Sequence, residues 1–173
     1  GTVCDAFVYN VDVIDTITEL VGLPVPSGWD GRSFLPMLKG LNDTKRDYVV
    51  LDHGLYTCQR AVRDSKWHFI RTYHPGLYRF DPVTLYDMEN DPHQLVNVAD
   101  RYPEVVKEMD YRIAEWVQQN LAKHGHRGDP MQKVIETGPF KYVTPGGWAQ
   151  RLRTEGREEV AEELLAKYSK KWA

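Results

Sequence analysis

The sequence predicts an α+β fold, in which a small antiparallel sheet of about four strands is covered by a long helix. Four short segments rich in β-branched and aromatic residues follow one another between residues 46 and 87. Their connections are too short for crossover helices, which favours antiparallel pairing. A long amphipathic segment follows at Pro103. The 173 residues suffice for one domain, or for one domain and part of another.

Composition argues against several function classes. The chain has 22 Lys and Arg against 25 Asp and Glu, a net charge of -3, so bulk charge does not indicate a nucleic-acid binder. No apolar run approaches the roughly 20 residues that span a bilayer. Two cysteines, Cys4 and Cys58, do not form a disulfide framework, and they are compatible with one bridge or with two free thiols.

The first 45 residues predict a strand and two helices. Residues 3–11 have the composition of a strand. Asp12 stands where a helix N-cap belongs, and Gly22 is a natural stop. A short second helix is expected between Ser33 and Gly40. The predicted apolar side of the first helix consists of Val13, Ile14, Ile17, Leu20 and Val21.

The middle of the chain predicts the sheet. We expect strands over 48–51, 59–63, 67–73 and 85–87. The segment 64–66 between the second and third strands has the composition of a hairpin turn.

A long helix is expected to cover one face of this sheet. Pro103 suits its first turn and Gly125 its end. Residues 125–147, rich in Gly and Pro, predict a surface excursion, and 154–172 a charged amphipathic helix. The apolar stripe of the long helix comprises Val105, Val106, Met109, Ile113, Trp116, Val117 and Leu121.

Three blocks, in this order, resemble the C-terminal third of sulfatases, within the alkaline-phosphatase-like superfamily. The first lies in residues 11–40 and contains VDVIDT, LVGLPVP and DGRSFLPMLKG. The second is QRAVRDSKWHFI (59–70), and the third is LYDMENDPHQLVNVA (85–99). The resemblance covers about residues 3–123. Asp15 stands where the family commonly has Pro, and Gln94 where an acidic residue is usual; both positions are structural.

The resemblance implies a domain organisation. Residues 1–45 would be the end of the large α/β catalytic domain, and 46–124 the C-terminal subdomain with its antiparallel sheet and helix. The main partner would then be the N-terminal catalytic domain. Residues 125–173 resemble nothing known and would form an extension used for packing or for homo-oligomer formation.

The resemblance also implies hydrolysis of sulfate esters. Sulfatases use a formylglycine, made from Cys or Ser in a Cys/Ser-x-Pro-x-Arg motif, and a divalent cation, usually calcium. Neither Cys4 nor Cys58 begins such a motif, and no serine in the sequence begins one. The family's metal-binding Asp-Asp and Asp-Asn pairs are also missing from the sequence. We therefore expect no catalytic residue and no metal ligand in this chain, and no activity without the rest of a sulfatase.

By analogy with the family, the loop 52–57 is expected to help shape the substrate pocket. Candidate contacts with a sulfated small molecule or glycan are His53, Tyr56, Arg60 and His74. A hydrogen-bonding or cationic lip suits a sulfate ester, and an aromatic ring can stack on a sugar. Each candidate also has a structural explanation: backbone bonding for His53, packing for Tyr56, an ion pair for Arg60 and a turn for His74.

Two other functions stay open at this stage. A phosphonate monoester or phosphodiester hydrolase of the same superfamily would share this fold. A non-catalytic binding or oligomerisation module would need no catalytic half at all.

Overall fold

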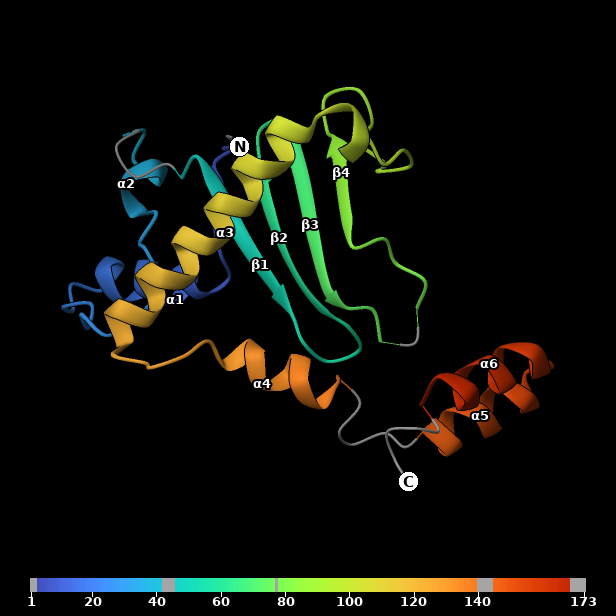
Figure 1. Cartoon of the computed structure of the whole chain (residues 1–173). Coiled ribbons are helices and arrows are strands. Elements are labelled where there is room, and N and C mark those ends of the chain that lie inside the picture. Colours follow the sequence, from blue (N-terminus) through green and yellow to red (C-terminus); the bar gives the residue numbers. More distant parts are fainter. Residues whose placement is uncertain (1–2, 42–45, 77, 140–144, 169–173) are drawn as a thin grey trace. The chain divides into compact units, whose positions relative to one another are not determined.

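Four strands form one sheet in chain order. The computed structural model describes residues 3–41, 46–76, 78–139 and 145–168 (Figure 1). The strands are β1 (Tyr48–His53), β2 (Cys58–Asp64), β3 (Trp67–His74) and β4 (Val83–Asp87), in the spatial order β1-β2-β3-β4. Neighbouring strands run in opposite directions (Figure 1), so the predicted α+β class with a four-stranded antiparallel sheet is confirmed.

The β2–β3 hairpin turns where the sequence predicted it. The Asp64 carboxylate accepts hydrogen bonds from the backbone amides of Lys66 (2.9 Å) and Trp67 (2.6 Å). This side-chain cap satisfies two amides that the turn leaves without a ladder partner. The other Asp64 oxygen accepts from Arg112 at 2.9 Å, which joins the turn to the long helix.

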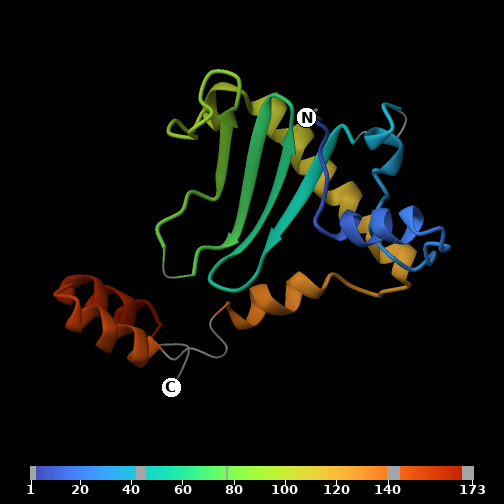
Figure 2. The ribbon, with the colours of Figure 1, turned by 180° about the vertical axis from the view of Figure 1, so that it is seen from behind.

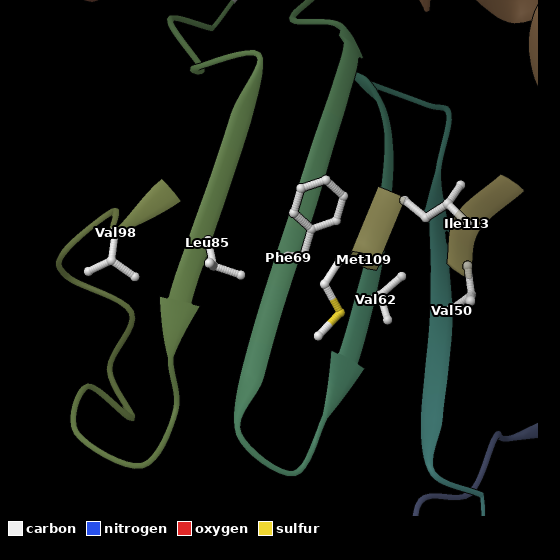
Figure 3. Close-up of a cluster of buried hydrophobic side chains, with 7 residues drawn as sticks. All are labelled: Val50, Val62, Phe69, Leu85, Val98, Met109 and Ile113. Carbon is white, nitrogen blue, oxygen red and sulfur yellow. The ribbon is translucent and has the colours of Figure 1, made fainter. Parts of the chain in front are cut away.

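The long helix α3 (Pro103–His124) crosses one face of the sheet (Figure 1) and has the predicted bounds. Gly125 follows it in the left-handed conformation (φ 64°), which glycine adopts at little cost. Side chains from the strands and from α3 meet in the core drawn in Figure 3. The core residues are Val50, Val62, Phe69, Leu85, Val98, Met109 and Ile113. Burying each of the larger ones contributes about 1.5–3 kcal/mol.

Helix α1 (Val11–Leu20) turns its polar side inward. Asp12, Asp15 and Thr16 are buried, with exposed fractions of 0%, 3% and 5%. In contrast, Ile14, Ile17 and Leu20 are 54%, 52% and 64% exposed. Most surface helices bury their apolar stripe, so this arrangement is inverted. The short helix α2 (Leu35–Leu38) follows.

The sequence had predicted Asp12 as the N-cap of α1, and this is wrong. Asn10 is the N-cap, and Asp12 lies inside the helix. The Asp12 carboxylate instead joins three segments. It accepts from the amides of Tyr9 (2.6 Å) and Arg32 (2.8 Å) and, in a bidentate pair, from Arg46 (2.5 and 2.8 Å). Burial alone raises the pKa of Asp12, but the Arg46 guanidinium and the two amides outweigh it and hold this pKa below its ordinary value.

The strand predicted over residues 3–11 is wrong. Residues 3–9 run beside β1 without regular secondary structure (Figure 2). The hydroxyl of Tyr9 donates to the Val50 carbonyl (3.0 Å) and accepts from the Val50 amide (2.6 Å). A side chain thus satisfies backbone groups at the edge of β1, where another strand would otherwise pair.

The C-terminal part contains three helices: α4 (Pro130–Thr137), α5 (Pro145–Thr154) and α6 (Glu158–Tyr168). The excursion predicted over 125–147 therefore missed α4 and the start of α5. The helix predicted over 154–172 is present as α6, which begins at Glu158 and not at Thr154. Gly156, at φ 74°, ends α5, and the amide of Arg157 bonds to the Leu152 carbonyl at 2.9 Å. Residues 169–172 lie outside the described residues.

The chain divides into two compact units. The first unit comprises Gly1–Leu51, Arg60–Ile70 and Val83–Arg127, and the second unit Asp52–Gln59, Arg71–Pro82 and Gly128–Ala173. The domain boundaries expected near residues 45 and 124 stay a prediction. None of the helices in the described ranges has the length and apolar character that crossing a membrane requires.

Candidate functional site

One end of the sheet carries the loops expected to contact substrate. In an antiparallel sheet ordered β1-β2-β3-β4, the β1–β2 and β3–β4 connections emerge at the same end (Figure 1). Both connections belong to the second unit. The sequence candidates His53, Tyr56 and His74 lie here, whereas Arg60 lies in the first unit.

His53, the last residue of β1, and Tyr56 of the β1–β2 loop form a small aromatic pair. The Tyr56 amide donates to the Nε2 atom of His53 at 3.4 Å, a long hydrogen bond. The two rings are stacked, with centroids 6.2 Å apart and planes 27° apart. Tyr56 is 43% exposed, and His53 is exposed as well. The pair therefore leaves part of the Tyr56 ring and the His53 imidazole exposed to solvent.

A chain of polar side chains holds the base of this loop. The Thr57 hydroxyl donates to Oε1 of Gln59 at 3.0 Å, and Nε2 of Gln59 donates to the Thr72 hydroxyl at 3.0 Å. Thr57 is only 3% exposed. These bonds fix the last residue before β2 to the neighbouring strand β3. The sequence candidates did not include these three residues, although polar residues on facing strands of a predicted hairpin are a usable signal.

His74 ends β3 and shapes the turn that follows it. Its Nδ1 atom accepts from the Gly76 amide at 3.0 Å. Its Nε2 atom would lie 3.7 Å from a Cβ atom at Gly138, in ordinary van der Waals contact. His74 is half-buried, and its ring is held by the turn and lies close to Gly138.

Arg60 is placed differently from the other candidates. It is 6% exposed, and its guanidinium carbon lies 5.8 Å from the centre of the Trp116 ring on α3. A cation over an indole face is favourable, particularly where both are shielded from water. This contact supports the structural explanation of Arg60, since it engages the guanidinium in the layer between sheet and helix.

The residues present do not fit the formylglycine and the cation of sulfatases. Within the described ranges, no group of three or more His, Cys, Asp or Glu side chains is arranged to hold a metal ion. Cys58 is fully buried, and burial raises the pKa of its thiol. Cys4 is exposed and free, and it is followed by Asp5 and Ala6 and not by the sulfatase motif.

Comparison with known proteins identifies a family. The model of the C-terminal region of N-sulphoglucosamine sulphohydrolase matches residues 1–119. An N-acetylglucosamine-6-O-sulfatase from Bacteroides thetaiotaomicron is 30% identical over 148 residues, which cover 82% of this chain and 25% of the relative. The chain spans between 20% and 30% of the length of the curated sulfatases that it matches.

Solved structures share the fold. A structure in complex with its substrate D-glucosamine-2-N,6-O-disulfate gives a TM-score of 0.56 at 22% identity, covering 72% of this chain and 26% of that protein. The phosphonate monoester hydrolase of Agrobacterium radiobacter gives 0.50 at 21% identity, covering 74% of this chain and 27% of the enzyme. At these identities the likeness concerns the fold alone.

Proposed function

The chain belongs to the family of C-terminal regions of N-sulphoglucosamine sulphohydrolase, and on this premise we propose that it is the C-terminal part of a sulfatase. The whole protein hydrolyses sulfate esters of sugars. This part completes the fold and shapes the substrate pocket. The nucleophile and the metal ligands come from a preceding catalytic domain, so the chain alone is inactive.

The inverted helix α1 is the observation that carries this proposal. Its buried side holds the carboxylate of Asp12 with four hydrogen bonds, while Ile14, Ile17 and Leu20 face solvent at more than half exposure. Exposed contiguous apolar side chains of this size mark a contact surface. Each would contribute about 1.5–3 kcal/mol on burial. The partner that fits is the large α/β domain that precedes such regions in sulfatases.

The substrate contacts proposed for this part are His53, Tyr56 and His74. The exposed Tyr56 ring is suited to stacking on the apolar face of a sugar, and the His53 imidazole to bonding a hydroxyl or a sulfate oxygen. A sugar sulfate is favoured as substrate class because a relative at 30% identity is an N-acetylglucosamine-6-O-sulfatase. Arg60 is assigned to packing against Trp116.

Rejoining the chain to the preceding part of its open reading frame tests the proposal. We expect the joined protein to release sulfate from a sugar or aryl sulfate, and the 173-residue chain to release none. Tyr56→Ala should lower kcat/KM by roughly tenfold, about 1.4 kcal/mol. The matched control is Tyr111→Ala, since Tyr111 is 66% exposed on α3.

A phosphonate monoester hydrolase is the second candidate, because one such enzyme shares the fold. The joined protein distinguishes the two when it is offered an aryl sulfate and an aryl phosphonate at equal concentration. Preferred cleavage of the phosphonate would overturn the sulfatase assignment. A third outcome, a natural open reading frame that contains no preceding catalytic domain, would instead support a non-catalytic module.

A further inference from the structure

A concave surface lies in the second unit. Tyr78 and Arg79 of the β3–β4 connection form one wall of this groove. The helical hairpin of α5 and α6 forms the other, through Trp148 and Leu152. An ion pair between Arg79 and Glu163 of α6 ties the two walls together. We call this surface the hairpin groove.

The groove has a firm apolar base. Ala149, Ala161 and Leu164 are buried between α5 and α6, with exposed fractions of 0%, 0% and 6%. Trp148 and Leu152 pack against this cluster and also line the groove. The hairpin is therefore a small packed element with its own core, and the groove wall that it provides is preformed.

An exposed aromatic ring stands at the opposite wall. Tyr78 is 47% exposed, and its ring centroid lies 5.3 Å from that of Phe80, which is also 47% exposed. Aromatic pairs at this spacing stabilise each other's orientation. The Phe80 contact thus holds the Tyr78 ring while much of that ring remains open to a ligand. A flat, half-exposed aromatic surface beside a groove suits a sugar, whose axial C–H groups form an apolar face.

The charges of the groove favour a neutral ligand. Its lining contains three basic side chains, Arg79, Arg157 and Lys167, and three acidic ones, Glu155, Glu159 and Glu163. A site for a sulfate or a phosphate would need an excess of cations. Sugar hydroxyls both donate and accept hydrogen bonds, and therefore suit a lining that offers carboxylates and guanidinium groups together.

We propose that the hairpin groove binds unsulfated sugar units of a glycan chain, with Tyr78 stacking on one ring. This inference rests on the proposed function in taking a sulfated sugar as substrate. It adds a binding site for those sugar units of the glycan that carry no sulfate. The groove then retains an extended glycan independently of the sulfate group that is hydrolysed.

Binding to the full 173-residue chain tests this inference without any catalysis. The probes are unsulfated tetrasaccharides of glucose, galactose and N-acetylglucosamine, titrated while the indole N–H signal of Trp148 is followed by NMR. We expect dissociation constants in the millimolar range for at least one probe. Tyr78→Ala should weaken that binding by roughly tenfold, whereas Tyr78→Phe, which keeps the ring, should retain it.

Tyr111→Ala serves as the control, because Tyr111 is also an exposed tyrosine and lies on α3 in the first unit. The inference is overturned if no tetrasaccharide binds, or if Tyr78→Ala and Tyr111→Ala bind alike. It is also overturned if sedimentation shows that the groove is closed by a second copy of the chain and that Tyr78→Ala releases it. None of these outcomes affects sulfate release by the joined protein, so the two proposals fail separately.

Discussion

His68 on β3 shows how burial and a side-chain hydrogen bond act in opposite directions on the pKa of one partly buried group. Its Nδ1 atom lies 2.7 Å from Oε1 of Gln94, and its Nε2 atom is buried and makes no hydrogen bond to any described residue. The side-chain oxygen of Gln94 accepts from Nδ1, so in the neutral ring the proton is placed on Nδ1. Burial lowers the pKa of His68; the Gln94 bond opposes this, and the charge of Arg63 adds to it.

The backbone at Gln94 is held for this contact. Gln94 has φ 57°, in the left-handed region that residues other than glycine rarely adopt. Asp91 fixes the turn, because its carboxylate accepts from the amides of Leu95 (2.8 Å) and Val96 (2.9 Å). The same amides hold the pKa of Asp91 below its ordinary value.

Gln94→Glu should raise the pKa of His68 and change the response to acid. The folded chain disfavours the charged form of His68. The neutral ring therefore stabilises the fold fully above the ordinary pKa of 6.5, and this stability is lost as pH falls below that value. A carboxylate at position 94 favours the imidazolium and should reduce this loss. NMR titration of the His68 ring, with urea unfolding at about pH 7 and about pH 5, measures both effects.

Gln94→Met provides the matched control, since it removes the acceptor and adds no charge. Its His68 pKa should fall further, because the bond that opposes burial is gone. Equal His68 titration curves in the Glu and Met variants would show that Gln94 does not set this pKa.

At the scale of elements, Gly31 lets its loop approach helix α1. A Cβ atom at Gly31 would come within 2.6 Å of Cγ and Oδ1 of Asp15 and within 2.7 Å of Oδ2. Asp15 is 3% exposed, so its side chain has little room to move. The absence of a side chain at position 31 is therefore a packing requirement.

Gly31→Ala should destabilise the first unit by about 1–3 kcal/mol through this overlap. In a chain that already carries Asp15→Ala, Gly31→Ala should have almost no further effect on the unfolding free energy, because the clashing carboxylate is gone. Gly28→Ala is the control, since nothing lies within 4 Å of its added Cβ. Urea midpoints of the unmodified chain, Asp15→Ala, Gly31→Ala and the double variant measure the coupling. Additive effects at positions 15 and 31 would contradict the overlap.

Patterns within one element predicted more than relations between elements. The apolar stripe and end signals of α3 gave its bounds, because 3.6-residue periodicity, Pro103 and Gly125 agree. Two misses had readable local signals. Asp129 caps α4 through the Met131 amide at 2.9 Å, with Pro130 in the first turn, and Gly156 separates α5 from α6.

Other predictions were wrong or missing where the outcome depends on contacts between elements. Residues 3–9 have strand composition, but a strand needs a partner backbone, and Tyr9 uses its side chain on β1 instead. At the candidate site, loop position was readable for His53 and Tyr56. The contact between Arg60 and Trp116 could not be predicted, because it depends on which face of β2 the helix α3 covers.

At the scale of the whole molecule, the exposed side of α1 supports the proposal that this chain docks on a catalytic domain. A module that functions alone has no reason to bury Asp12 and Asp15 while it exposes three large aliphatic side chains on the same helix. A region that docks on another domain has that reason, since the aliphatic side is covered in the assembled protein. The division into two units does not change this, because all of α1 lies in the first.

Lysine at Ile14 and Ile17 tests this directly. The unmodified chain should self-associate through the exposed side of α1, and Ile14→Lys with Ile17→Lys should reduce that association in sedimentation velocity. Both side chains are about half exposed, so unfolding free energy should change by no more than about 0.5 kcal/mol per substitution.

In the joined protein the same two lysines would be forced into an apolar contact and should abolish soluble expression or sulfate release. Tyr111→Lys, on the exposed side of α3, should leave association and release unchanged. If the α1 lysines leave both unchanged too, the aliphatic side of α1 contacts nothing, and the proposal that this chain docks on a catalytic domain through α1 is wrong.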